Sequence, residues 1–119
     1  MKILLISNNL HYLKNVRRIL MRMGYICHSI NDFMKVKDSL NENSYEIVIF
    51  DAELLQPEDY HYLLSFEKEK RKESFILLIS KRKKDKMEMD IEKLFSNILA
   101  KPLDLDELIT YIEKKIDNI

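Results

Sequence analysis

Apolar residues along the chain follow two alternating patterns. Continuous apolar runs, typical of strands buried on both faces, occur at 3–6, 47–50 and 75–79, with weaker runs at 25–30 and 98–100. Between these runs, apolar residues recur at spacings of three and four, which predicts amphipathic helices. The pattern therefore predicts five strands that alternate with five helices.

Local signals predict where the helices begin and end. Gly24 lies where a left-handed C-cap is expected, and Pro57 lies at the first position of the third helix. The basic run at 81–84 is predicted to be a loop, after which Asp85 caps the fourth helix. The core positions of that helix are predicted to be Met87, Ile91, Leu94 and Phe95.

Strand–helix alternation with doubly apolar strands predicts an α/β fold, in which helices cover both faces of a parallel sheet. At 119 residues the chain is long enough for one domain, so residues 1–119 are expected to form a single unit. The usual solution is a flavodoxin-like (βα)5 three-layer sandwich with a five-stranded parallel sheet in the order 2-1-3-4-5. The strand ends that meet in such a sheet carry Ser7-Asn8-Asn9, Asp51, Ser80-Lys81 and Lys101-Pro102.

Composition narrows the classes of function. Basic and acidic residues balance at 20 each, so whole-chain charge does not favour nucleic acid or anionic lipid. The single Cys27 has no disulfide partner, which fits a cytoplasmic protein, and no apolar run approaches the roughly 18 residues of a membrane span. No glycine-rich phosphate loop follows the first strand, and the three histidines show no metal-ligand spacing. An ordinary hydrolase or nucleotide-binding site is therefore not expected.

The polar strand ends resemble those of the response-regulator receiver domain, and the resemblance covers the whole chain. In that family an aspartate after strand three accepts a phosphoryl group. A Ser or Thr after strand four and the lysine of a Lys-Pro pair after strand five contact that group. Asp51, Ser80 and Lys101-Pro102 stand at these positions. The resemblance implies a signalling module, not an enzyme, with Asp51 as phosphoacceptor and Ser80 and Lys101 as phosphate contacts.

The chain departs from this family at the metal site. The family has two acidic residues after strand one that hold Mg²⁺, whereas this chain has Ser7 and Asn8. The resemblance leaves Asn8, Asp51 and the main-chain carbonyl of Glu53 as ligands, although Mg²⁺ prefers carboxylates. Because phosphoryl transfer to a carboxylate relies on that ion, we expect weak Mg²⁺ binding, no other cofactor, and slow or absent phosphorylation. Asn8 still offers one neutral oxygen, so partial activity stays open.

Two further positions differ from the family. Ile98 replaces the aromatic residue that rotates inward on activation, and Lys81 replaces a small residue beside the phosphate position. One hypothesis is that the ammonium group of Lys81 or Lys101 pairs with Asp51 in place of the metal ion and locks the domain in one state. Alternatively, the run at 81–84 is a solvated loop, or it contacts an acidic partner or nucleic-acid phosphates.

The sequence therefore predicts an atypical receiver domain that acts through protein–protein contacts in bacterial signalling or gene regulation. The resemblance implies a contact or homodimer face on helix four, strand five and helix five, where Met89 and Tyr111 are candidates. The alternative is a working switch that a histidine kinase phosphorylates at Asp51. A third class is a DNA-contacting module that uses the basic run. Otherwise, contact with nucleic acid would require an output domain beyond residue 119.

Overall fold

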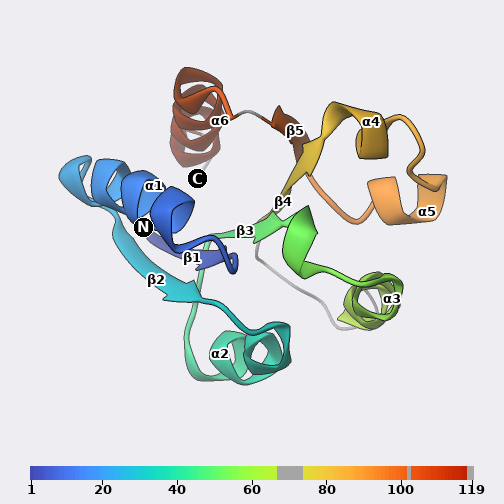
Figure 1. Ribbon diagram of the computed structural model, residues 1–119. Helices are drawn as coiled ribbons and strands as arrows, with labels where there is room; N and C mark the ends of the chain where they lie inside the picture. Colours follow the sequence, from blue (N-terminus) through green and yellow to red (C-terminus); the bar gives the residue numbers. More distant parts are fainter. Residues whose placement is uncertain (67–73, 102, 118–119) are drawn as a thin grey trace.

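A parallel β-sheet forms the centre of the computed structural model, which describes residues 1–66, 74–101 and 103–117. The strands are β1 (Lys2–Ile6), β2 (Ile26–Ile30), β3 (Ile47–Asp51), β4 (Ser74–Ser80) and β5 (Asn97–Lys101). In this part of the chain they form one sheet in the order β2-β1-β3-β4-β5, and every neighbouring pair is parallel (Figure 1). The predicted flavodoxin-like fold and strand order are confirmed.

Helices cover both faces of this sheet and produce three layers (Figure 1). On one face lie α1 (Leu10–Arg22) and α6 (Leu105–Asp117). On the other lie α2 (Val36–Glu42), α3 (Pro57–Phe66) and α5 (Met89–Glu92). The short α4 (Lys81–Lys84) follows β4 directly, and the 3-10 helices η1 (Phe33–Lys35) and η2 (Ala52–Leu54) follow β2 and β3. No helix among the described residues is long and apolar enough to cross a membrane.

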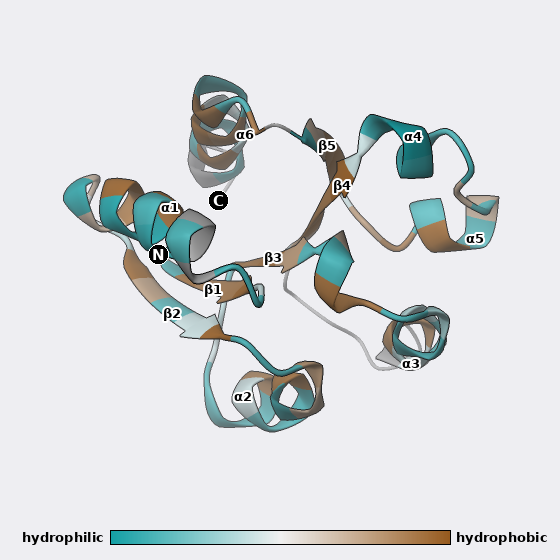
Figure 2. Ribbon diagram, viewed as in Figure 1, coloured by the Kyte–Doolittle hydropathy of each residue, from teal (hydrophilic) through white to brown (hydrophobic). Residues whose placement is uncertain are grey.

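Each face of the sheet packs into its own apolar core layer. Successive side chains of a strand point to opposite faces, so Ile49 faces the α1 and α6 layer while Phe50 faces the α3 and α5 layer. Phe50 packs edge-to-face on Phe75 and Phe95, with ring centroids 4.9 and 6.0 Å apart. Figure 2 shows β3 and β4 as continuous apolar segments between the layers. Burial on both faces explains why β1, β3 and β4 are apolar runs and not alternating sequences.

Two of the predicted helix boundaries are confirmed. Gly24 has φ +93°, the left-handed conformation that lets the chain turn from α1 into β2. Pro57 is the first residue of α3, where its missing N–H costs no helical hydrogen bond. Asp32 caps the turn before α2, because its carboxylate accepts a hydrogen bond from the N–H of Met34.

The fourth helix differs from the prediction. Residues 81–84, predicted to be a loop, form the one-turn helix α4 with Ser80 as N-cap. Asp85, predicted to be an N-cap, is instead the C-cap of α4. The next helix, α5, begins at Met89 after the extended residue Glu88.

The charged residues between β4 and α5 explain why two short helices form here instead of one. Residues 81–86 are all charged, and α4 is the most hydrophilic helix in Figure 2. None of these side chains packs into the core, so no buried contact holds α4 and α5 together as one continuous helix. Ile91, Leu94 and Phe95 are buried as predicted, and they fix only the second turn against the sheet.

Cys27 provides a direct test of this packing. Its side chain is buried in β2, and burial raises the pKa of the thiol to about 11, even though the nearby Arg17 guanidinium lowers it. At pH 8 about one thiol in a thousand would be ionised, against about one in four for an ordinary exposed cysteine. We expect iodoacetamide to label the folded protein at least about 100-fold more slowly than the protein in guanidinium chloride. Equal labelling rates in the two conditions would contradict this packing.

Candidate functional site

The carboxyl ends of β1, β3 and β5 bring Ser7 together with two predicted site residues, Asp51 and Lys101. Asp51 is the last residue of β3, Ser7 follows β1, and Lys101 is the last residue of β5. The Asp51 side chain is buried, with 1% of its surface exposed. A buried carboxylate requires hydrogen-bond donors and an opposite charge, and the neighbouring strand ends supply both.

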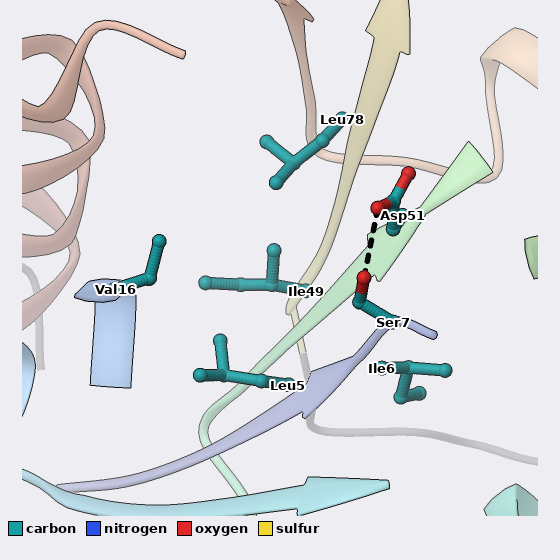
Figure 3. A pocket seen from close by; sticks show the side chains of 7 residues that line it. All are labelled: Leu5, Ile6, Ser7, Val16, Ile49, Asp51 and Leu78. Atoms are coloured by element: carbon teal, nitrogen blue, oxygen red, sulfur yellow. Dashed lines mark hydrogen bonds between the residues drawn. The ribbon is translucent and has the colours of Figure 1, made fainter. Parts of the chain in front are cut away.

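Both carboxylate oxygens of Asp51 are engaged. The Ser7 hydroxyl donates to Oδ2 at 2.8 Å, as Figure 3 shows. The Lys101 ammonium donates to Oδ1 at 2.6 Å, and the backbone N–H of Glu53 donates to the same oxygen at 3.1 Å. Charge-assisted hydrogen bonds of this kind are about twice as strong as neutral ones. The carboxylate therefore has a cation and two further donors within the protein itself.

Sequence reasoning treated Ser7 as a lost metal ligand, whereas the structure makes it a hydrogen-bond donor. Its side chain is buried, and its oxygen also accepts a hydrogen bond from the N–H of Asn9 at 3.1 Å. Ser7 thus connects the turn between β1 and α1 to the end of β3. The sequence signal for this role was a small hydroxyl residue facing an aspartate across neighbouring parallel strands.

The two lysines considered as substitutes for a metal ion lie in different surroundings. Lys101 contacts Asp51, its side chain is 20% exposed, and its ammonium lies 3.7 Å from the Glu53 carboxylate. Lys81 lies exposed in α4, and in the described part of the chain no ion pair joins it to Asp51. The hypothesis of a Lys81–Asp51 pair therefore has no contact to support it, because α4 begins immediately after β4 and directs Lys81 to solvent.

The residues at this site do not fit a Mg²⁺ ion. Asn8 is exposed, and Asp51 is already paired with Ser7 and Lys101. Among the described residues, no group of three or more His, Cys, Asp or Glu side chains is placed to hold a metal. Mg²⁺ usually needs one or two carboxylates and several waters in octahedral geometry. Ser7 contributes no negative charge here, and its hydroxyl donates to the carboxylate that a metal would need.

The cavity beneath Asp51 is small and apolar. It has a volume of about 10 Å³ and is seen from close by in Figure 3. Apart from Ser7 and Asp51, its lining consists of Leu5, Ile6, Val16, Ile49 and Leu78. This is near the lower limit for a single water molecule, which would also need two or more polar partners. The cavity is a packing defect beside the site and has no room for a ligand.

The other predicted site residues lie around this centre. Ser80 is exposed, and its hydroxyl accepts a hydrogen bond from the N–H of Lys83 at 3.4 Å. Ile98 is half-buried and packs against the core layer that contains Phe50. Pro102 lies outside the described residues.

The two predicted contact residues differ in exposure. Met89 is 71% exposed on α5. Tyr111 is half-buried on α6, and its hydroxyl lies 2.6 Å from the Ser96 hydroxyl. Met89 is therefore free to meet another surface, whereas Tyr111 already contributes to the packing of α6.

The ion pair can be tested by removing its charge. Lys101→Met leaves the buried carboxylate of Asp51 without its cation, so we expect the free energy of unfolding to fall by about 1–3 kcal/mol. The double variant Asp51→Asn/Lys101→Met removes both charges and should recover most of that loss. Urea denaturation measures both effects. Lys81→Met is the matched control and should change stability by less than about 0.5 kcal/mol. Equal effects of Lys101→Met and Lys81→Met would rule out the ion pair as a stabilising contact.

Comparison with known proteins agrees with this architecture. No protein-family model and no curated protein matches the sequence. Among solved structures, a response regulator receiver domain protein from Clostridium thermocellum superposes with a TM-score of 0.82 at 21% identity, covering 98% of this chain and 94% of that one. The receiver domain of the TMAO respiratory system response regulator TorR gives 0.85 at 13% identity, covering 99% and 98%.

A third similar structure was solved with ligands. It is the response regulator TrrA from Thermotoga maritima in complex with Mg(2+)-BeF. It superposes with a TM-score of 0.80 at 17% identity, covering 96% of this chain and 97% of that one. The structural likeness extends over nearly the whole chain, and this protein has the fold of CheY-like response-regulator receiver domains.

Proposed function

We propose that this chain is a response-regulator receiver domain that signals through protein contacts without phosphorylation at Asp51. The single observation that supports this most directly is the occupation of both Asp51 oxygens by donors from the chain itself. In this proposal Lys101 and Ser7 replace the metal ion and hold Asp51 in one state.

The charges in the pocket favour the proposal that Asp51 is not phosphorylated. Asp51 and Lys101 together are neutral, and the Glu53 carboxylate lies 3.7 Å from the Lys101 ammonium. Phosphorylation would replace the single negative charge of the Asp51 carboxylate with about two on the acyl phosphate, a net gain of about one negative charge. A single lysine would have to compensate both that group and Glu53, a task that a divalent cation performs in phosphoryl transfer. Ser7 and Asn8 are neutral and cannot recruit such a cation.

The proposal also includes the role, location and partners of the domain. The domain, residues 1–119, would act as an interaction module and not as an enzyme, in the cytoplasm, alone or as the N-terminal part of a longer regulator. Its partners would be proteins, including a histidine kinase or a second copy of the chain. Nucleic acid would be contacted only through a separate output domain.

We place the contact face of this module on α5, β5 and α6, which correspond to helix four, strand five and helix five of the resemblance. Met89 supports this choice because it is a large apolar side chain left 71% exposed on α5. Ser96 lies between α5 and β5, and its hydroxyl is 2.6 Å from that of Tyr111 on α6. This contact joins the two parts of the face. Ile98 lies on β5 between them and keeps an apolar side chain at the position of the family's rotating aromatic residue.

The alternative is a working switch phosphorylated at Asp51. The observation in its favour is that Asp51 and Lys101 keep the positions that the family uses for the acceptor and its lysine. Ser80 also keeps its position at the end of β4. The alternative therefore depends on whether Mg²⁺ can displace the Ser7 hydroxyl from Asp51.

The variant Ser7→Asp/Asn8→Asp separates the two proposals, because it restores the missing carboxylates. We expect acetyl phosphate and Mg²⁺ to leave wild type unmodified by intact-mass measurement, and Mg²⁺ to leave its melting temperature unchanged. In the variant the new carboxylates lie close to Asp51, so Mg²⁺ should raise the melting temperature and bind at least about tenfold more tightly than in wild type.

Asp51→Asn is the control for this measurement, because any adduct at the acceptor must disappear in it. A labile phosphoryl adduct on wild type that is lost in Asp51→Asn would establish the working switch. Mg²⁺ stabilisation of wild type equal to that of the double variant would overturn the proposed metal-independent pocket.

The contact face can be tested at Met89. We expect the wild-type domain to form a homodimer in sedimentation equilibrium, and Met89→Glu to weaken it at least about tenfold, because the new carboxylate joins Asp90 and Glu92 on α5. Met34→Glu is the matched control, since Met34 is 81% exposed on η1, away from this face. Equal weakening by both variants, or a wild-type protein that stays monomeric, would reject the homodimer.

A further inference from the structure

A groove separates α3 from the α4 and α5 segment on the side of the sheet that carries α2. Its volume is about 360 Å³, within the range of sites that bind small ligands or anchor side chains. Figure 1 shows α5 and α3 next to each other on one side of the sheet. The groove shares neither Met89 nor Tyr111 with the proposed contact face. It does include Ile91 of α5, so it adjoins that face and differs from it in using neither Met89 nor Tyr111.

The base of the groove is apolar and comes from residues next to the site. Ala52 directly follows Asp51, and Ile79 directly precedes Ser80; both are buried and line the groove with Leu55 and Ile91. The half-buried side chains of Tyr60 and Met87 form its walls. This lining would accept an apolar side chain of about the size of leucine or phenylalanine.

The rim of the groove is mostly basic. Lys83 and Lys86 line it and are exposed, His61 lies on α3, and Glu88 is its one acidic residue. Beyond the rim, α4 presents Lys81, Arg82 and Lys84 to solvent as well. Because the whole chain has a formal net charge of +0, this concentration of cations is a local feature and not a consequence of composition.

We propose that this groove binds an acidic segment of a partner protein, with one apolar side chain anchored between Tyr60 and Met87 and carboxylates facing Lys83 and Lys86. An apolar pocket at the centre and complementary charges at the edge are the usual arrangement of a peptide-binding hot spot. The proposal goes beyond the function given above, and it holds whether or not Asp51 accepts phosphate.

The groove is physically connected to the Asp51 site. Burial raises the pKa of the Tyr60 phenol, and the negative charges of Asp59 and Asp51 raise it further. The rim residue Lys83 donates its backbone N–H to the Ser80 hydroxyl, and this bond holds the first turn of α4 in place. A segment bound here would therefore lie against the same strand ends that carry Asp51 and Ser80.

A protein segment fits these observations better than the other anions. The row of cations continues along α4 outside the groove, which a small ligand confined to the groove would not use. Nucleic acid would use the cations but not the apolar base, and of the groove-lining residues only Tyr60 and His61 have aromatic rings on which bases could stack. An acidic segment with an apolar anchor uses both parts of the surface.

The test uses short fluorescein-labelled peptides and the wild-type domain. The acidic probe has a central Leu-Phe pair flanked by Glu and Ser; one control replaces the pair with Ala-Ala, and the other replaces each Glu with Lys. We expect fluorescence anisotropy to show binding of the acidic probe at least about tenfold tighter than either control, weakening as salt rises. In the wild-type protein, NMR shifts on peptide addition should concentrate at Ala52, Leu55, Ile79 and Met87.

Matched charge reversals complete the design. Lys83→Glu/Lys86→Glu changes the rim and should weaken the acidic probe at least about tenfold. Lys14→Glu/Lys114→Glu makes the same change in net charge on exposed positions of α1 and α6, and should alter affinity less than about twofold. The binding assay contains neither phosphodonor nor Mg²⁺, so its result is read independently of the phosphorylation assay.

Four outcomes would overturn the proposal. The first is no binding of the acidic probe at about 1 mM protein, and the second is equal losses in both charge-reversal variants. The third is binding of a duplex DNA of similar charge that depends on Lys83 and Lys86 while the peptide fails, which would assign the surface to nucleic acid. NMR shifts confined to α1 or α6 would likewise place the peptide elsewhere.

Discussion

The 2.6 Å ion pair between Lys101 and Asp51 is the contact on which the site depends. The two residues end β5 and β3, with β4 between them, so the pair links strands that share no backbone hydrogen bonds. Burying a carboxylate without a partner would cost several kcal/mol, and the sheet supplies the partner only when all three strand ends are in register. The register places Asp51 beside Leu78 and Lys101 beside Ser80, so the fold and the pocket are satisfied by the same strand alignment.

Ser7 determines the electrostatic state of this pocket. A carboxylate at that position would face Asp51 with a like charge, and the two would need a divalent cation to remain close. The Ser7 hydroxyl instead provides a proton, donates it to Asp51 at 2.8 Å, and accepts a hydrogen bond from the Asn9 N–H. One hydroxyl thus satisfies the second oxygen of Asp51 without adding charge. The pocket is complete with the side chains of the chain alone, which is why we propose a function that does not require phosphate.

The sheet could be predicted from the sequence because strands buried on both faces leave an unambiguous signal. The runs at 3–6, 47–50 and 75–79 have no helical alternative of that length. The polar residues after the runs at 47–50, 75–79 and 98–100 placed Asp51, Ser80 and Lys101 at one edge. The fourth helix could not be predicted, because a run of charged residues carries no periodicity to distinguish a loop from a helical turn. The partners of Asp51 were also beyond the sequence. From the sequence, Lys81 and Lys101 were both candidate cations for Asp51, and only the direction of α4 shows that Lys81 faces solvent. Ser7 was noted in the sequence only as an uncharged replacement for an acidic residue.

The role of Ser80 connects the pocket to the surface beyond it. Its hydroxyl caps α4 through the N–H of Lys83, so the short basic helix begins directly at the strand end instead of after a flexible loop. This cap fixes one wall of the groove in which Ala52 and Ile79 form the base. If Asp51 is not phosphorylated, as we propose, its internal contacts would leave the neighbouring groove in one form. Control of signalling would then depend on the supply of the partner and not on the chemistry of Asp51.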